Sequence, residues 1–246
     1  MSSVFDYHLA LSFDTTHWSV IAAARGPDPD AARAALSTLC EAYWYPVYAF
    51  VRRWGADPDA ARDLTQGFFA SLLERRDFES VRPERGRFRT FLLASAKHFL
   101  LNEAARGRAA KRGGGAAPLP LVFDEAEGRY QFEPADVATP ETLYERRWAL
   151  TLIERVLAAL RSDWVASGRA AGEFDELKES LLGGGPAGGY AEAARRLDTT
   201  EGALKVAAHR LRRKFQARLR QEIGQTVADQ ADIDDEIQYL VHALHV

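Results

Sequence analysis

The segment at residues 190–215 constrains the fold most, because it reads as two short helices joined by a tight turn. In the first helix, Ala191, Ala194 and Leu197 recur every three residues and predict a small packing face. The turn interrupts this pattern, and we expect Thr200 to cap the second helix. In that helix, spacings of four, three and four predict a buried stripe made of Leu204, Ala208, Leu211 and Phe215. The arrangement is typical of a helix-turn-helix motif.

The second helix of this pair is strongly cationic. Residues 195–220 hold nine Lys or Arg and two acids, a net charge of +7. Lysine and arginine can neutralise DNA phosphates, and the first turn of a helix in the major groove can reach base edges. The alternative is a solvated, salt-bridged helix of an ordinary helical domain. The tight turn and the preceding short helix favour duplex DNA binding over that alternative.

Charge is segregated along the chain, although the whole protein carries only −3. Residues 82–112 again hold nine Lys or Arg and two acids, for a net charge of +7. Residues 221–246 hold six acids and no Lys or Arg. Because two basic blocks and an acidic tail cancel in the total, the local fields indicate the binding partners better than the net charge does.

The sequence also excludes several classes of function. Cys40 is the single cysteine, so an intrachain disulfide and a CxxC metal site are excluded. No apolar stretch approaches the roughly 20 residues of a membrane span, and the N-terminus lacks the pattern of a secretion signal. We find no phosphate-binding glycine loop, no metal-spaced His/Cys set and no nucleophile elbow. We therefore expect a cytoplasmic protein that is not an enzyme, needs no cofactor or metal and does not contact a membrane.

Helical periodicity covers most of the chain and strand signals are almost absent, so we expect an all-α fold. Pro46 lies inside the first long helix, where we expect a kink or break near Tyr45. Thr139 and Pro140 mark the start of a later long helix. The linker before them holds three prolines and five acids, and we expect it to be extended or partly ordered. The predicted segments are a helical domain at 1–112, this flexible acidic linker at 113–139, a helix-turn-helix domain at 140–224 and an acidic C-terminal extension with a helix at 225–246.

Three segments in this order resemble the bacterial RNA polymerase sigma factors of the extracytoplasmic-function (ECF) group. The first, YPVYAFVRRWGADPDAARDLTQGFFASLLER, is similar to the family's segment that binds the clamp of core RNA polymerase. The second, RGRFRTFLLASAKHFLLNEAARGRAAKR, is similar to the segment that melts the promoter and reads the −10 element. The third is the helix pair at 190–215, similar to the −35 reader. The resemblance covers residues 31–220 and implies a factor that places core polymerase at promoters and helps to open the DNA.

The resemblance assigns roles to individual residues in the first two segments. It implies polymerase binding by Arg52, Arg53, Asp63, Gln66, Phe69 and Leu73. It implies −10 binding and melting by Arg82, Glu84, Arg85, Arg87, Arg89, Lys97, His98, Asn102 and Arg106. Cationic and aromatic side chains suit this task, because they bind single-strand phosphate and stack on flipped bases. His98 and Asn102 stand where the family usually has Asn and Asp, so the base preference at −10 stays open. We expect at least two of the nearby aromatic residues to be core: Phe88, Phe91 and Phe99.

In the third segment, the resemblance implies −35 binding by Thr200, Glu201, Lys205, Val206, His209, Arg210 and Arg213. Val206 and Ala207 stand where the family usually has Ser and Arg. Direct hydrogen bonds to bases should therefore be fewer, with more weight on thymine-methyl contacts and DNA shape. We expect Arg212, Arg213 and Lys214 to be phosphate clamps or solvated charges and not base readers.

The acidic extension at 225–246 lies beyond this resemblance. Its apolar stripe consists of Ile233, Ile237, Leu240 and Leu244. Two roles fit it. It can pack beneath the last domain as structural support, which we favour, or it can fold onto a basic DNA-binding surface and restrain promoter binding. The acidic linker leaves a similar choice, between mimicry of RNA inside the polymerase and a plain acidic spacer.

The expected partners are core RNA polymerase and promoter DNA, and an anti-sigma or other regulatory protein is an open third. Two other functions compete with this interpretation. One is a helix-turn-helix transcriptional regulator that acts without being a polymerase subunit, and the −10-like helix argues against it because a duplex reader needs no melting segment. The other is an anti-sigma or adaptor protein, and the cationic second helix at 201–215 argues against that.

Overall fold

The computed structural model describes residues 29–74, 87–109, 124–131, 133, 139–181, 184–227 and 229–245. These residues form helices and turns with no strand among them, which confirms the predicted all-α fold. The helices in chain order are α2 (Pro29–Arg53), α3 (Pro58–Glu74), α4 (Phe88–Ala109), α5 (Asp124–Tyr130), α6 (Pro140–Ala166), α7 (Ala171–Leu177), η3 (Lys178–Ser180), α8 (Gly189–Arg196), α9 (Glu201–Gly224), η4 (Gln230–Asp232) and α10 (Ile233–His245).

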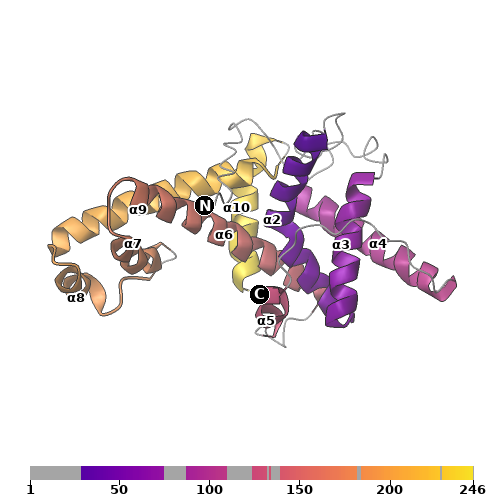
Figure 1. Ribbon diagram of the computed structural model, residues 1–246. Coiled ribbons are helices and arrows are strands. Elements are labelled where there is room, and N and C mark those ends of the chain that lie inside the picture. The colour runs from indigo at the N-terminus through magenta and orange to yellow at the C-terminus, as the bar shows by residue number, and fades with distance from the viewer. Residues whose placement is uncertain are drawn as a thin grey trace, which may run out of the picture.

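The centre of the molecule is built by α2 and α6, which pack against each other (Figure 1). Tyr43 and Phe50 of α2 are fully buried, as are Tyr144 and Trp148 of α6. The rings of Phe50 and Tyr144 meet edge to face at 6.5 Å, a favourable aromatic geometry. The core continues from here to α9. Thus α6, which the sequence analysis assigns to the second domain, packs on the first, and the domain boundaries at 112 and 139 stay predictions.

Pro46 does not break α2, so of the expected kink or break near Tyr45 the break is excluded. The helix runs from Pro29 to Arg53 with Pro46 inside it. A proline in a helix interior removes one backbone donor and costs about 3 kcal/mol in isolation. Here Tyr45, Val47 and Tyr48 around it are all buried, so packing offsets the loss. The surrounding tertiary contacts therefore keep the helix in one piece.

Two helix starts predicted from the sequence are confirmed by their hydrogen bonds. The Thr139 hydroxyl accepts from the Thr142 backbone N–H at 3.1 Å and caps α6, with Pro140 in its first turn. The Thr200 hydroxyl accepts from the Ala203 backbone N–H at 3.2 Å and caps α9. Both caps satisfy a donor that the first turn of a helix leaves without an intrahelical partner.

The predicted linker contains a docked helix, α5, where the sequence analysis expects an extended or partly ordered chain. Ala126 of α5 is fully buried in the same core as α2. Glu127 accepts from Arg52 and Tyr48, and Glu133 accepts from the Tyr45 hydroxyl at 2.8 Å. Two of the five linker carboxylates thus have partners inside this chain, while 113–123, 132 and 134–138 lie outside the described residues.

The predicted stripe of α9 is confirmed, since Leu204, Ala208, Leu211 and Phe215 are all buried. These residues pack with α7 and α8. The packing face of α8 differs from the prediction. Ala193 and Ala194 are buried and Leu197 is half-buried, whereas Ala191 is exposed. The buried face of α8 therefore includes the adjacent residues Ala193 and Ala194, and Ala191 lies outside it.

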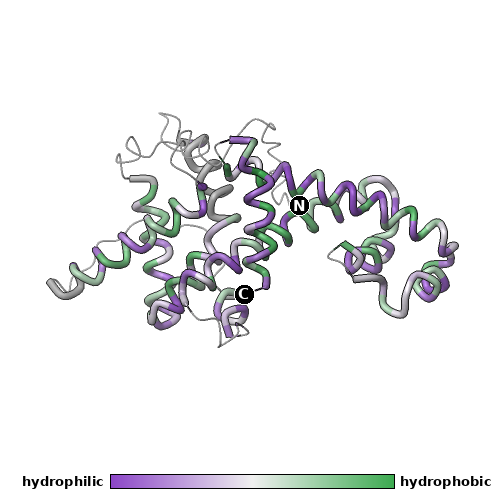
Figure 2. Tube along the Cα trace, turned by 180° about the vertical axis from the view of Figure 1, so that it is seen from behind, coloured by the Kyte–Doolittle hydropathy of each residue, from purple (hydrophilic) through white to green (hydrophobic). Residues whose placement is uncertain are grey.

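The acidic extension forms α10, which packs on α6 and α9. Leu240 and Ala243 are buried, and Ile233, Ile237 and Leu244 pack at the edge of the core. Figure 2 shows hydrophobic and hydrophilic residues alternating along α9 and α10, as expected of helices that are buried on one side. In Figure 1, α8 and the start of α9 lie at one end of the molecule and the C-terminal half of α4 lies at the other.

Candidate nucleic-acid and polymerase interfaces

The turn between α8 and α9 has a compact hydrogen-bonded geometry. The backbone N–H groups of Leu197 and Thr199 donate to the carbonyls of Ala193 and Ala194, at 3.0 and 2.9 Å. Asp198 takes a positive φ of 48°, in the left-handed region that Asn and Asp tolerate better than most residues. Together with the Thr200 cap, this fixes the direction in which α9 leaves the turn.

The exposed side of α9 carries the residues predicted for −35 binding. Val206, His209, Arg210 and Arg213 are all exposed and follow each other at helical spacing, so they share one face. Lys205 lies beside them and pairs with Glu201 at 2.6 Å, which raises the pKa of Lys205. Half of the surface of Val206 is accessible. The face therefore offers cations together with one apolar contact.

Arg212 binds within the protein, whereas the sequence analysis expects a phosphate clamp or a solvated charge. Its guanidinium donates to the Ser180 backbone carbonyl at 2.9 Å, and the side chain is half-buried. This hydrogen bond ties α9 to the end of η3. Arg212 differs in this from the exposed residues Arg210 and Arg213.

The second half of α4 presents the residues predicted for −10 binding. His98 and Asn102 are exposed one turn apart, and Leu101 beside them is 56% exposed. Lys97 pairs with Glu141 of α6 at 2.7 Å, and Arg106 pairs with Glu103 at 2.6 Å. Phe88 and Phe99 are buried in the core, which confirms that at least two of the three nearby aromatic residues are structural. Arg82, Glu84 and Arg85 lie outside the described residues.

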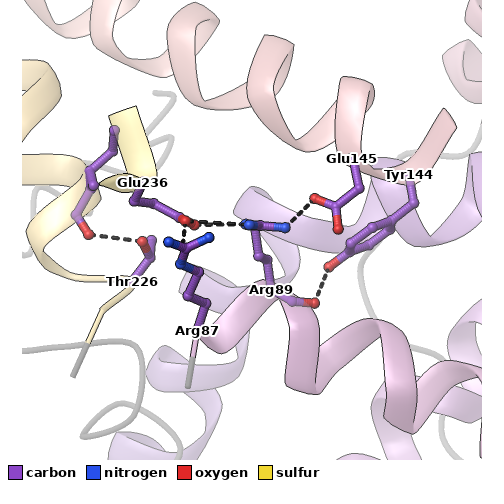
Figure 3. Close-up of polar contacts among 7 residues, drawn as sticks. Arg87, Arg89, Tyr144, Glu145, Thr226 and Glu236 are labelled. Carbon is purple, nitrogen blue, oxygen red and sulfur yellow. Dashed lines mark hydrogen bonds and ion pairs between the residues drawn. The ribbon is translucent and has the colours of Figure 1, made fainter. Parts of the chain in front are cut away.

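Arg89 is not placed where the sequence analysis expects it. Its side chain is 3% exposed, so the predicted DNA contact is not supported. Its guanidinium binds Glu236 of α10 at 2.7 Å and Glu145 of α6 at 2.5 Å (Figure 3). Its backbone carbonyl accepts from the buried Tyr144 hydroxyl at 3.1 Å. Arg89 therefore acts inside the protein, because a buried charge requires paired carboxylates.

Three further groups complete this cluster. Arg87, at 31% side-chain exposure, binds Glu236 at 2.8 Å. The Tyr239 ring lies 3.7 Å from the Arg89 guanidinium, a cation–π contact. Burial opposes the charge of Arg89, but the hydrogen bond with Glu236 and the charges of Glu145 and Glu236 outweigh it, so the pKa of Arg89 is raised. Burial also raises the pKa of Glu145, against the opposing charge of Arg89.

Glu145 and Glu236 were not among the residues singled out from the sequence. A signal for Glu236 exists, because it lies three residues after Ile233 and four before Leu240 on the predicted apolar stripe. An acid on a buried face requires a basic partner. The sequence does not say which arginine that partner is.

The residues predicted to bind polymerase divide between surface and interior. Asp63 is exposed and Gln66 is half-buried on α3. Arg52 and Arg53 are half-buried at the end of α2, and Arg52 is engaged with Glu127. Phe69 is fully buried and forms an edge-to-face pair with Phe68, so it stabilises the core and does not offer a contact surface. The Leu73 side chain lies outside what the structure describes.

The docking of α5 on α2 should weaken in acid. The hydrogen bond from Arg52 lowers the pKa of Glu127 below its ordinary value of 4.5. Such a carboxylate contributes stability above its unfolded pKa and loses that contribution as pH falls through the folded pKa. Glu127→Gln should therefore lower the free energy of unfolding by about 1.5 kcal/mol at pH 7 and by much less below a pH of about 4.

Urea unfolding of wild type and variant between pH 7 and pH 3 measures this difference. Glu179→Gln removes an exposed carboxylate from η3 and serves as the matched control. A difference between wild type and Glu127→Gln that stays constant over this range would contradict the assignment of the ion pair.

Two negative findings apply to the described part of the chain. Among these residues, no group of three or more His, Cys, Asp or Glu side chains is placed to hold a metal ion. None of the described helices has the length and apolar character needed to cross a membrane.

Comparison with protein-family models matches residues 39–110 to Sigma-70 region 2. The matched stretch includes the second half of α2, all of α3 and all of α4. Comparisons with curated proteins and with solved structures give no match. Residues 39–110 are therefore similar to Sigma-70 region 2, and this similarity supports a sigma-type transcription initiation factor that binds RNA polymerase.

Proposed function

We propose that this protein is a sigma factor of the ECF group that directs core RNA polymerase to a set of promoters and helps to open them. The observation that carries the proposal is the Sigma-70 region 2 match at 39–110, followed in the same chain by a cationic helix pair. One domain would bind polymerase and the −10 element, and the other would bind the −35 element. The protein would act as a polymerase subunit and catalyse no reaction itself.

Recognition of the −35 element would use the exposed face of α9 in the major groove. Arg210 and Arg213 would contact phosphates or base edges, and Val206 would contact a thymine methyl group. The N-terminal end of α9, capped by Thr200, would face the DNA backbone. Lys205, paired with Glu201, would contribute less charge than its neighbours.

Recognition and melting of the −10 element would use α4 and the residues that precede it. His98 and Asn102 present hydrogen-bonding groups on one exposed face, and Lys97 and Arg106, each paired with a glutamate, lie at its edges. Arg82, Glu84 and Arg85, which precede α4 in the sequence, complete the proposed set. Single-stranded DNA binds to such surfaces through phosphate neutralisation and base stacking. Polymerase would dock on the neighbouring surface around Asp63 and Gln66.

A second candidate is a helix-turn-helix regulator that binds duplex DNA without polymerase. The exposed cationic face of α9 favours it as much as it favours a sigma factor, because either would use this face on duplex DNA. The region 2 match favours the sigma factor. An anti-sigma partner would fit the first candidate, and nothing in the described residues selects one.

The deciding experiment combines core-polymerase capture with transcription from a promoter library. A sigma factor should bind bacterial core RNA polymerase stoichiometrically and produce new start sites that share −10 and −35 sequences. Retained affinity for duplex DNA without binding to core polymerase would instead establish the regulator.

A further inference from the structure

The C-terminal extension contacts the start of α4, the helix that carries the proposed −10 residues. The Phe88 backbone N–H donates to the Thr226 carbonyl at 3.1 Å, just after α9 ends. Thr226 is 1% exposed, and its hydroxyl donates to the Ile223 carbonyl at 2.8 Å. The first turn of α4 is therefore held by backbone from the opposite end of the chain.

A single carboxylate of α10 binds two arginines at this point (Figure 3). Glu236 is fully buried. Its Oε1 accepts from Arg89 Nε at 2.7 Å, while its Oε2 pairs with Arg87 Nε at 2.8 Å. The two arginines lie two residues apart at the start of α4. By binding both guanidiniums, Glu236 restrains the position of this part of the chain.

The two arginines differ in burial and in the number of glutamates that they bind. Arg89 is enclosed by Glu236, Glu145 and the Tyr239 ring, so it anchors the cluster. Arg87 pairs through its Nε and keeps about a third of its side-chain surface exposed. Its guanidinium also lies 5.8 Å from the Tyr239 ring, so the ring and Glu236 together hold Arg87 while part of its side chain stays open to a nucleic acid.

We propose that Glu236 is a positioning residue for −10 recognition: it orients Arg87 relative to α4. This inference rests on the proposed function. It makes the acidic extension a required part of the promoter-opening unit, although its sequence is separated from that unit by more than a hundred residues.

The same contacts argue against a releasable restraint. Withdrawal of α10 would expose Leu240 and Ala243 and would leave Arg89 with Glu145 as its remaining carboxylate in this cluster. A switch requires two states of similar free energy, and a buried charge cluster of this kind is costly to separate. We therefore infer that the extension stays in place when the protein binds DNA.

The test compares Glu236→Gln with wild type in full-length protein bound to core polymerase. Initiation is measured on promoters that differ in one −10 base, and the ratio of rates between promoters is the readout. This ratio does not depend on the fraction of folded protein, so a purely structural role would not change it. We expect Glu236→Gln to reduce the ratio about fivefold, the lower end of what one good base contact contributes. Binding to an isolated −35 duplex should not change.

Asp234→Asn is the matched control, because it removes the exposed ion pair with Arg220 from the same helix. Arg87→Ala should reduce the ratio as Glu236→Gln does, and the double variant should show no further reduction because both act through one contact. If Glu236→Gln does not fold, Glu236→Asp keeps the charge with a shorter reach and is measured instead.

An unchanged ratio in Glu236→Gln overturns the inference, as does increased initiation at every promoter, which would indicate a restraint. Additive effects of Arg87→Ala and Glu236→Gln would also overturn it. If wild type fails to initiate from any promoter, the proposed function itself fails and the inference falls with it.

Discussion

Arg89→Ala is expected to lower the free energy of unfolding by about 3–5 kcal/mol, the cost of removing one partner from a buried ion pair. The substitution leaves Glu236, which is fully buried, and Glu145 without their central cation. It also removes the guanidinium that lies against the Tyr239 and Trp148 rings. Few single substitutions on this chain should be as damaging.

Urea unfolding at pH 7 measures this loss, with Arg161→Ala as the control. Arg161 is exposed and pairs with Asp175 on the surface, so its removal should cost less than about 1 kcal/mol. The deficit of Arg89→Ala should shrink as pH falls toward 4.5, because Glu145 already has a raised pKa and becomes neutral more readily without Arg89. A loss similar to that of Arg161→Ala would mean that water reaches the two carboxylates.

The double substitution Arg210→Ala and Arg213→Ala is expected to weaken binding to a −35 duplex by about 10- to 100-fold at moderate salt. Both side chains are exposed on the same face of α9, away from its buried stripe, so folding should not change. If both contact phosphates, the slope of log affinity against log salt concentration should also fall in magnitude by about two. Fluorescence anisotropy with a labelled duplex at several salt concentrations measures both quantities.

Arg220→Ala is the control for this experiment, because it removes one positive charge from the other end of α9, where Arg220 pairs with Asp234. Its effect on affinity and slope should be small. Equal losses in Arg220→Ala and in the double variant would show that general charge, and not the face of α9, accounts for DNA binding.

The sequence alone determined the features that depend on neighbouring residues. The stripe of Leu204, Ala208, Leu211 and Phe215 was predictable because helical periodicity places these side chains on one face whatever covers them. The caps by Thr139 and Thr200 were predictable because a hydroxyl satisfies the backbone of its own first turn. The exposed face of α9 follows from the same periodicity.

The tertiary structure decided what covers each face, and this reassigned several residues. Arg89 and Phe69 looked like binding residues in a linear motif, yet both are buried. Pro46 is accommodated inside α2, and a helix in the acidic linker docks on Arg52. For both arginines the deciding contact joins distant parts of the chain: Arg89 and Glu236 are 147 residues apart, and Arg52 and Glu127 are 75 apart. A local pattern shows which side chains face inward, but only the packing of whole helices selects their partners, because that choice depends on the summed burial and charge pairing of the entire chain.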